Sequence, residues 1–226
     1  MSPFPVARGK EVTSDGFIIK WSQVEGAEYY IVEIRAADGF YKADKVRPLS
    51  LEDHVDRPTG LQHNTKHDIT IKAFNKFTEG SEMTKSFYTR PMTPSRFRGV
   101  SVFDDEVSLT WDPVDGINKY DIHIYDDNNH LGHVVIQDET QHTFKELIPN
   151  HHYIFVIRAY GHIVSDPATT KIYTKIEGVD YLTMNEVYDD RMILDWKDAD
   201  GARSYRVEFS FENTRGEKSE VRQEFC

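Results

Sequence analysis

The sequence predicts an all-β chain of sandwich modules joined end to end, two of them complete and a third cut short. Three observations predict this class. Trp21, Trp111 and Trp196 lie 90 and 85 residues apart, and each ends an alternating apolar run. Apolar residues recur with a period of two, as in antiparallel strands that bury one face. No segment shows a sustained helical period.

Each tryptophan opens a repeated pattern. A small apolar residue follows three positions later, a glycine five positions later, and a tyrosine nine positions later begins a second alternating run. These residues are Val24, Gly26 and Tyr30; Val114, Gly116 and Tyr120; and Ala199, Gly201 and Tyr205. The glycine marks a turn between two strands. We therefore predict that the tryptophan and tyrosine of each repeat fill the space between two stacked sheets.

The expected strands follow in order from these runs. The first strands cover 17–21, 107–111 and 192–196, and the second cover 30–34, 120–124 and 205–209. The match between the second and third repeats extends upstream through the linker, where Thr89 corresponds to Thr174 and Val102 to Val187. The expected modules are therefore residues 1–91, 92–176 and 177–226.

The third module is expected to supply only its first strands, so Leu194, Trp196, Tyr205 and Val207 lack an opposing face. Truncation of the chain is the favoured explanation. The alternatives are a dimer formed through this incomplete module, or a segment that lies on the second module.

Composition narrows the classes of partner. The net charge is −11, and the excess of acidic residues lies after residue 92. Acidic surfaces repel phosphate backbones and anionic lipid heads, so we expect no nucleic-acid partner and no direct membrane contact. No secretory signal is recognisable at residues 1–5. Cys226 is the only cysteine, which excludes an intrachain disulfide.

These patterns resemble the fibronectin type III family, a set of immunoglobulin-like β-sandwiches. The family has a buried tryptophan, a strand opened by tyrosine, and a leucine before a run of alternating apolar residues that ends in alanine. The second repeat supplies Leu147, Pro149, Tyr153, Phe155, Ile157 and Ala159. The first repeat matches with Leu61, Thr65, Ile69, Ile71 and Ala73, but His67 stands at the position of the family's corner tyrosine. The resemblance implies seven strands per complete module and structural core roles for Trp21, Tyr30, Trp111, Tyr120, Tyr153, Trp196 and Tyr205.

The second repeat holds seven of the ten histidines, but their spacing argues against a metal site. His130 and His133 are three residues apart, so on a regular strand they point to opposite faces. His151 and His152 are adjacent and diverge, and His123 alternates with core residues and faces solvent. We expect scattered surface histidines, no metal and no cofactor.

The acidic clusters are interpreted as turns. Asp104–Glu106 and Asp189–Asp190 occupy equivalent positions between strands, and Asp126–Asn129 falls at an expected hairpin. None has the ligand spacing of an EF-hand loop. The chain also lacks a Gly-x-Ser-x-Gly elbow, a His-Glu-x-x-His motif and a phosphate-binding loop, so we expect no catalytic residues and no enzyme activity.

Protein binding through loops is the function that these arguments leave. The resemblance implies binding through the B–C and F–G loops, here Ser22–Glu28 and Asn75–Gly80, then Asp112–Lys119 and Tyr160–Ser165. Phe77 with Thr78, and Ile163 with His162, are the candidate protein contacts, because apolar residues in wet loops suit binding. The alternative is that Phe77 and Ile163 fold back over their own cores.

By the family's usual placement we expect a fragment of a cell-surface or secreted adhesion or receptor-like protein that binds protein ligands or acts as a spacer. An intracellular structural scaffold and an accessory module of a larger, carbohydrate-active enzyme are the alternatives.

Overall fold

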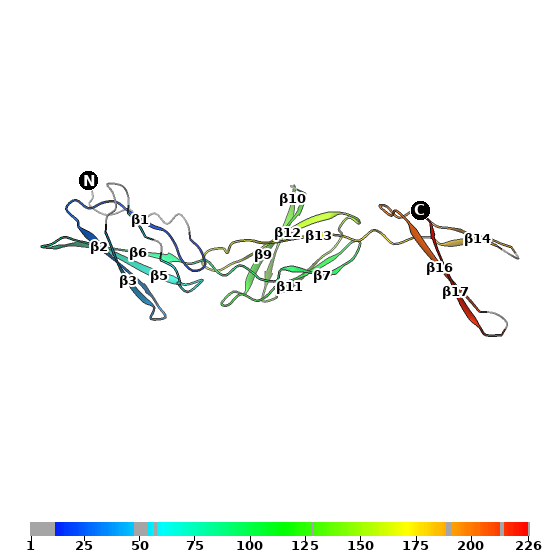
Figure 1. Cartoon of the computed structure of the whole chain (residues 1–226), viewed down its shortest axis with the longest axis horizontal. Helices are drawn as coiled ribbons and strands as arrows, with labels where there is room; N and C mark the ends of the chain where they lie inside the picture. The colour runs from blue at the N-terminus through cyan, green and yellow to red at the C-terminus, as the bar shows by residue number, and fades with distance from the viewer. Residues whose placement is uncertain are drawn as a thin grey trace. The chain divides into compact units, whose positions relative to one another are not determined.

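The computed structural model describes residues 12–47, 54–56, 58–127, 129–188, 191–212 and 215–225, with the backbone alone at 54–56. Every regular element in these ranges is a β-strand, which confirms the predicted all-β class (Figure 1). None of the described segments is a helix that could cross a membrane.

The first repeat forms a four-stranded antiparallel sheet and a strand pair. The sheet has the order β3-β2-β5-β6, and the pair joins β1 to β4. The strands are β1 (Ile19–Trp21), β2 (Tyr29–Ala36), β3 (Tyr41–Val46), β4 (His54–Asp56), β5 (Lys66–Phe74) and β6 (Glu79–Tyr88). Alternate residues of β2 and β5 pack with Trp21 and Phe17 in one buried cluster. The sandwich core predicted from the period of two is therefore present.

The second repeat forms two antiparallel sheets, of orders β10-β9-β12-β13 and β11-β8-β7. The strands are β7 (Arg98–Val102), β8 (Val107–Thr110), β9 (Lys119–Asp126), β10 (Asn129–Gln137), β11 (Gln141–Phe144), β12 (His152–Ala159) and β13 (Ala168–Tyr173). Buried side chains come from both sheets, and they include Trp111, Tyr120 and Tyr153, as predicted. The chain is thus built from tandem β-sandwiches.

Two hairpins make up the described part of the third repeat. They pair β14 (Thr183–Val187) with β15 (Met192–Asp195), and β16 (Tyr205–Glu212) with β17 (Lys218–Phe225). Leu194, Trp196, Tyr205 and Val207 are only half-buried, whereas their counterparts in the first two repeats are fully buried. This exposure agrees with the expectation that these residues lack an opposing sheet.

Backbone proximity groups the chain into two compact units. One comprises 1–98, 110–142 and 154–170, and the other 99–109, 143–153 and 171–226. This grouping passes through the second repeat and does not test the module boundaries after residues 91 and 176, which stay predictions.

The same hydrogen bond recurs in all three repeats. The tyrosine hydroxyl accepts the backbone N–H of the residue three positions after the tryptophan. The pairs are Tyr30 with Val24 at 2.8 Å, Tyr120 with Val114 at 2.9 Å and Tyr205 with Ala199 at 2.8 Å. The tyrosine and tryptophan rings lie 5.5, 5.4 and 5.6 Å apart. The offsets read from the sequence therefore correspond to one repeated structural unit.

In each of the two complete repeats, a buried threonine just after the last strand makes the same two hydrogen bonds. Thr89 Oγ1 accepts the N–H of Thr65 at 3.0 Å and donates to the Gln62 carbonyl at 2.6 Å. Thr174 Oγ1 accepts the N–H of His151 at 2.9 Å and donates to the Ile148 carbonyl at 2.7 Å. This match confirms that the alignment of the two repeats continues to the ends of their last strands.

His67 does not reproduce the bond of the corner tyrosine. In the second repeat the Tyr153 hydroxyl accepts the Ile148 N–H at 3.0 Å. The fully buried His67 instead directs Nδ1 at the Thr65 carbonyl at 3.0 Å, and its Nε2 has no hydrogen-bond partner among the residues that the structure describes. A buried nitrogen without a partner costs stability.

We expect His67→Tyr to raise the free energy of unfolding of the first module by about 0.5–1.5 kcal/mol, because the unpaired nitrogen is removed and a hydroxyl can accept from Gln62. Urea titration followed by the amide NMR signals of β2 and β5 measures this change. His67→Phe is the matched control, since it fills the site without a hydroxyl and should gain less. A lower midpoint for the tyrosine variant would contradict the alignment.

Stability of the first module should also depend on pH through His67. Burial lowers the pKa of His67, and its bond to Thr65 opposes that effect more weakly. An imidazole in the unfolded chain titrates near about 6.5. Between the two pKa values the unfolded chain binds more protons, so the free energy of unfolding falls as pH drops through that window, and it levels off below the folded pKa.

The advantage of His67→Tyr over the wild-type chain should therefore grow as the pH is lowered from about 7.5 to about 5.5, since tyrosine does not titrate in this range. The same NMR-detected urea titration, repeated at several pH values, measures the difference between the two chains. A difference that is independent of pH would show that His67 has the same protonation in both states.

Candidate functional site

The hairpin between β5 and β6 displays an aromatic ring on a fixed turn. Asn75 Oδ1 accepts the N–H groups of Phe77 and Thr78, both at 2.8 Å, and the Asn75 N–H donates to the Thr78 carbonyl at 3.0 Å. Phe77 is 83% exposed, and Thr78 beside it is also exposed. Phe77 therefore does not fold back over its own core.

A shallow groove lies beside this turn. It is lined by the B–C turn, residues 24–27, and by residues 73–75 and 78–80 of the hairpin. The two loops are held together by the Glu28 N–H, which donates to the Phe74 carbonyl at 2.8 Å. Lys76 lies 5.5 Å from the Phe77 ring centre, and Glu79 is paired with Lys72 at 2.8 Å. The two loops implied by the family resemblance thus form one surface with an apolar tip and a charged rim.

The second pair of candidate contacts is placed differently. The His162 ring lies 4.2 Å from the Tyr88 ring, and the His162 N–H approaches Asn64 Oδ1 at 3.4 Å. Ile163 is half-buried. A Cβ added to Gly161 would clash with Asn64 Oδ1, so the backbone approaches the first repeat closely. The loop Tyr160–Ser165 therefore packs against the first repeat of the same chain.

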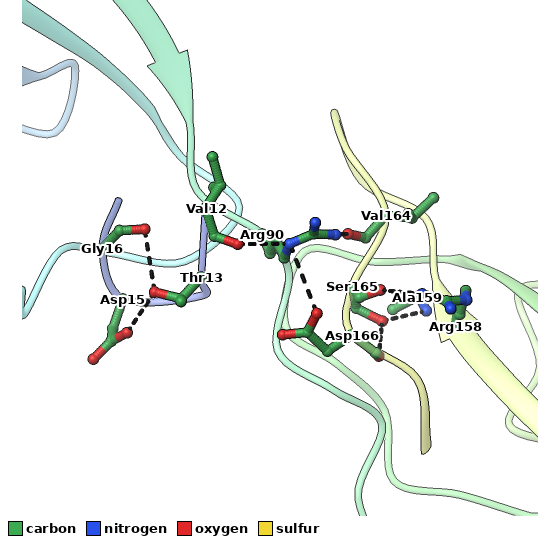
Figure 2. Close-up of polar contacts among 10 residues, drawn as sticks. All are labelled: Val12, Thr13, Asp15, Gly16, Arg90, Arg158, Ala159, Val164, Ser165 and Asp166. Carbon is green, nitrogen blue, oxygen red and sulfur yellow. Dashed lines mark hydrogen bonds and ion pairs between the residues drawn. The ribbon is translucent and has the colours of Figure 1, made fainter. Parts of the chain in front are cut away.

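Arg90 fixes this loop, and the sequence interpretation missed it. Figure 2 shows its guanidinium between two backbone carbonyls, with Nε donating to Val12 at 2.7 Å and Nη1 donating to Val164 at 2.6 Å. Asp166 lies 3.8 Å from Nε. The only signal in the sequence was the position of Arg90 beside Pro91 at the expected module boundary.

The loop has its own supports as well (Figure 2). Ser165 Oγ accepts the Ala159 N–H at 2.9 Å and donates to the Asp166 carbonyl at 2.8 Å. Arg158 donates to the Ser165 carbonyl at 3.2 Å. These bonds hold the end of the loop, whereas Arg90 holds its middle.

The histidine interpretation requires a correction. His130 and His133 do not point to opposite faces of a strand, because the register of β10 against β9 shifts between His130 and Gly132. Both rings lie within about 5 Å of His123, whose ring centre is 5.0 Å from that of His130 and 5.1 Å from that of His133. His123 is half-buried and does not simply face solvent. Leu131 is the extra residue of this β-bulge, and it places His133 on the same face of β10 as His130.

The acidic clusters lie in turns where the structure describes them. The Phe103 N–H donates to the Glu106 carbonyl at 2.8 Å, which closes the turn that holds Asp104 and Asp105 between β7 and β8. Asp126 and Asn129 flank the turn between β9 and β10. Asp189–Asp190 and Asn128 fall outside the described residues.

Comparison with known proteins shows what the second repeat and the tandem fold are similar to. Residues 92–175 match the model of the fibronectin type III domain. Mouse tenascin-N is 28% identical over 166 residues, which is 72% of this chain, and the chain spans 11% of that protein's length. A segment of two fibronectin type III domains from chicken tenascin matches with a TM-score of 0.51 at 15% identity, over 76% of this chain and all of that segment.

The fold defines a tandem array of β-sandwiches of the immunoglobulin-like class. Its second repeat, residues 92–175, matches the fibronectin type III family, as the residues of that repeat indicated.

We expect Arg90→Met to loosen the loop Tyr160–Ser165, because the Val164 carbonyl loses a charged donor while the aliphatic part of the side chain is retained. Hydrogen exchange measured by mass spectrometry on a peptide covering this loop should become faster. Arg96→Met is the matched control, since the exposed Arg96 pairs with Asp112 instead. Equal exchange in wild type and Arg90→Met would contradict a role for Arg90 in holding the loop.

Proposed function

We propose that the chain is a non-catalytic, protein-binding part of an extracellular or cell-surface adhesion protein. The similarity to tenascin-N over most of the chain supports this class. Phe77 is the observation that supports the binding role: a phenylalanine 83% exposed on a turn fixed by Asn75.

The physical argument concerns the cost of binding. Burying an exposed phenylalanine in a partner's pocket gains about 1.5–3 kcal/mol. A loop that is ordered before binding loses less conformational entropy on association. The Asn75 bonds supply that order, and Lys76 and Glu79 provide a polar rim around the ring. The partner is a protein with an apolar pocket, and the remaining sandwiches act as spacers.

The same proposal assigns no nucleic-acid partner and no catalysis to the chain. The net charge of −11 disfavours phosphate backbones. The binding surface is a pair of loops at the edge of a filled sandwich, and it requires no chemical step. Module boundaries after residues 91 and 176 are part of this proposal.

Cell attachment to surfaces coated with the whole chain tests the function. Coated wild-type chain should support attachment of fibroblasts, and trypsin treatment of the cells should abolish it. Phe77→Ala should reduce attachment several-fold, because the anchor of the interface is lost. Tyr181→Ala is the matched control, since Tyr181 is 80% exposed but lies outside the two loops.

Failure of the wild-type chain to support attachment would contradict the adhesion function. Attachment that is the same for Phe77→Ala and wild type would place the binding surface elsewhere. Far-ultraviolet circular dichroism of each variant confirms that the sheets are retained.

A further inference from the structure

A group of polar rings lies on the outer face of β9 and β10. In the register of the two strands His133 stands opposite His123, and Asp121 precedes His123 by two residues on the same face of β9. The shift of register between His130 and Gly132 brings His130 to this face too. Three side chains able to ligate a metal are therefore gathered around one point, with His130 beside them.

Asp121 is more buried than His123 and His133. Its side chain is only 7% exposed, which is unusual for a carboxylate that faces away from a core. Oδ1 lies 2.9 Å from His133 Nδ1, and Oδ2 lies 3.2 Å from His123 Nε2. The Tyr160 hydroxyl donates to Oδ2 at 3.3 Å. Burial raises the pKa of Asp121, but the bonds and charges of His133 and His123 outweigh it and hold that pKa below its usual value.

The distances suit a small metal ion. One ligand atom from each of Asp121, His123 and His133 lies within 4.8 Å of the others. Zinc binds imidazole nitrogen and carboxylate oxygen at about 2.0–2.2 Å, which puts tetrahedral ligands roughly 3.3 Å apart. The ligand atoms have to approach one another by up to about 1.5 Å to reach this geometry.

His130 stands behind the group as an outer partner. Its Nε2 lies 2.9 Å from His123 Nδ1, on the opposite side of the ring from Asp121. When His123 ligates through Nε2, its Nδ1 carries the proton and can donate to His130. A histidine ligand typically gives its second N–H to such a partner, which orients the ring.

We propose that Asp121, His123 and His133 bind a divalent transition-metal ion of the zinc type, with His130 as a positioning residue for His123. Two nitrogens and one oxygen give three protein ligands, a set that leaves the fourth position open. The His133 side chain is 52% exposed, so an ion can reach the group from solvent. The chemistry of nitrogen with carboxylate oxygen favours zinc over calcium or magnesium, which prefer oxygen alone.

The competing explanation is a hydrogen-bonded network without metal. Neutral histidines can satisfy every contact: His133 and His123 each donate to Asp121, and His130 donates to His123 Nδ1. This network would hold the two strands together and would gain nothing from zinc.

The test is equilibrium dialysis of the whole chain against zinc chloride, with bound zinc measured by mass spectrometry. A Cys226→Ser background removes the thiol as a competing ligand. Wild type in this background should bind one zinc per chain. Asp121→Asn and His133→Gln should lose that stoichiometric binding. His130→Gln should weaken it by about 10- to 100-fold, as expected of an outer partner.

His63→Gln is the matched control, because His63 is a half-buried histidine of the first repeat outside the group, and it should bind zinc as wild type does. X-ray absorption of the zinc-loaded chain should show nitrogen and oxygen ligands near about 2.0–2.1 Å. Absence of zinc binding by wild type, or equal binding by wild type and His133→Gln, would overturn the site and leave the metal-free network. Neither result bears on attachment through Phe77.

Discussion

The contact between each tryptophan and the tyrosine nine residues later is the interaction on which the rest of the structure depends. The tyrosine hydroxyl binds the backbone of the turn that separates two strands, so ring packing and turn geometry are set together. The next strand then begins in the register that sends alternate side chains inward. The third repeat keeps the same bond and ring distance although its tryptophan is only half-buried. The unit is therefore local, whereas burial requires an opposing sheet.

Most of the fold could be predicted because its signals are local and repeated. The tryptophan offsets located the turns, and the alternation of Tyr30, Val32 and Ile34 identified the buried face of β2. The same reasoning failed for His130 and His133, since counting by twos assumes a regular strand. One extra residue, Leu131, moves each following residue of β10 to the face opposite the one that a regular strand would give it. Periodicity carries no signal for such a bulge.

The candidate contact residues also divide into one whose exposure could be predicted and one whose exposure could not. Phe77 was correctly expected to lie in a wet loop, and the reason is local: Asn75 closes the turn beneath it. Ile163 has the same character in the corresponding loop, yet it is half-buried. Its neighbour His162 meets Tyr88, a residue distant in the sequence, and no local pattern records that contact. Loops are predictable where their own side chains shape them.

Arg90 has a mechanical consequence. Its guanidinium connects the Val12 carbonyl to the Val164 carbonyl by one bond on each side. Single bonds of this kind rupture one at a time, whereas the bonds of a sheared β-ladder must rupture together. Tension that draws these two segments apart would therefore break the arginine contacts at low force, before the sheets unravel. The link would re-form when the load is released, so the chain can lengthen slightly without unfolding.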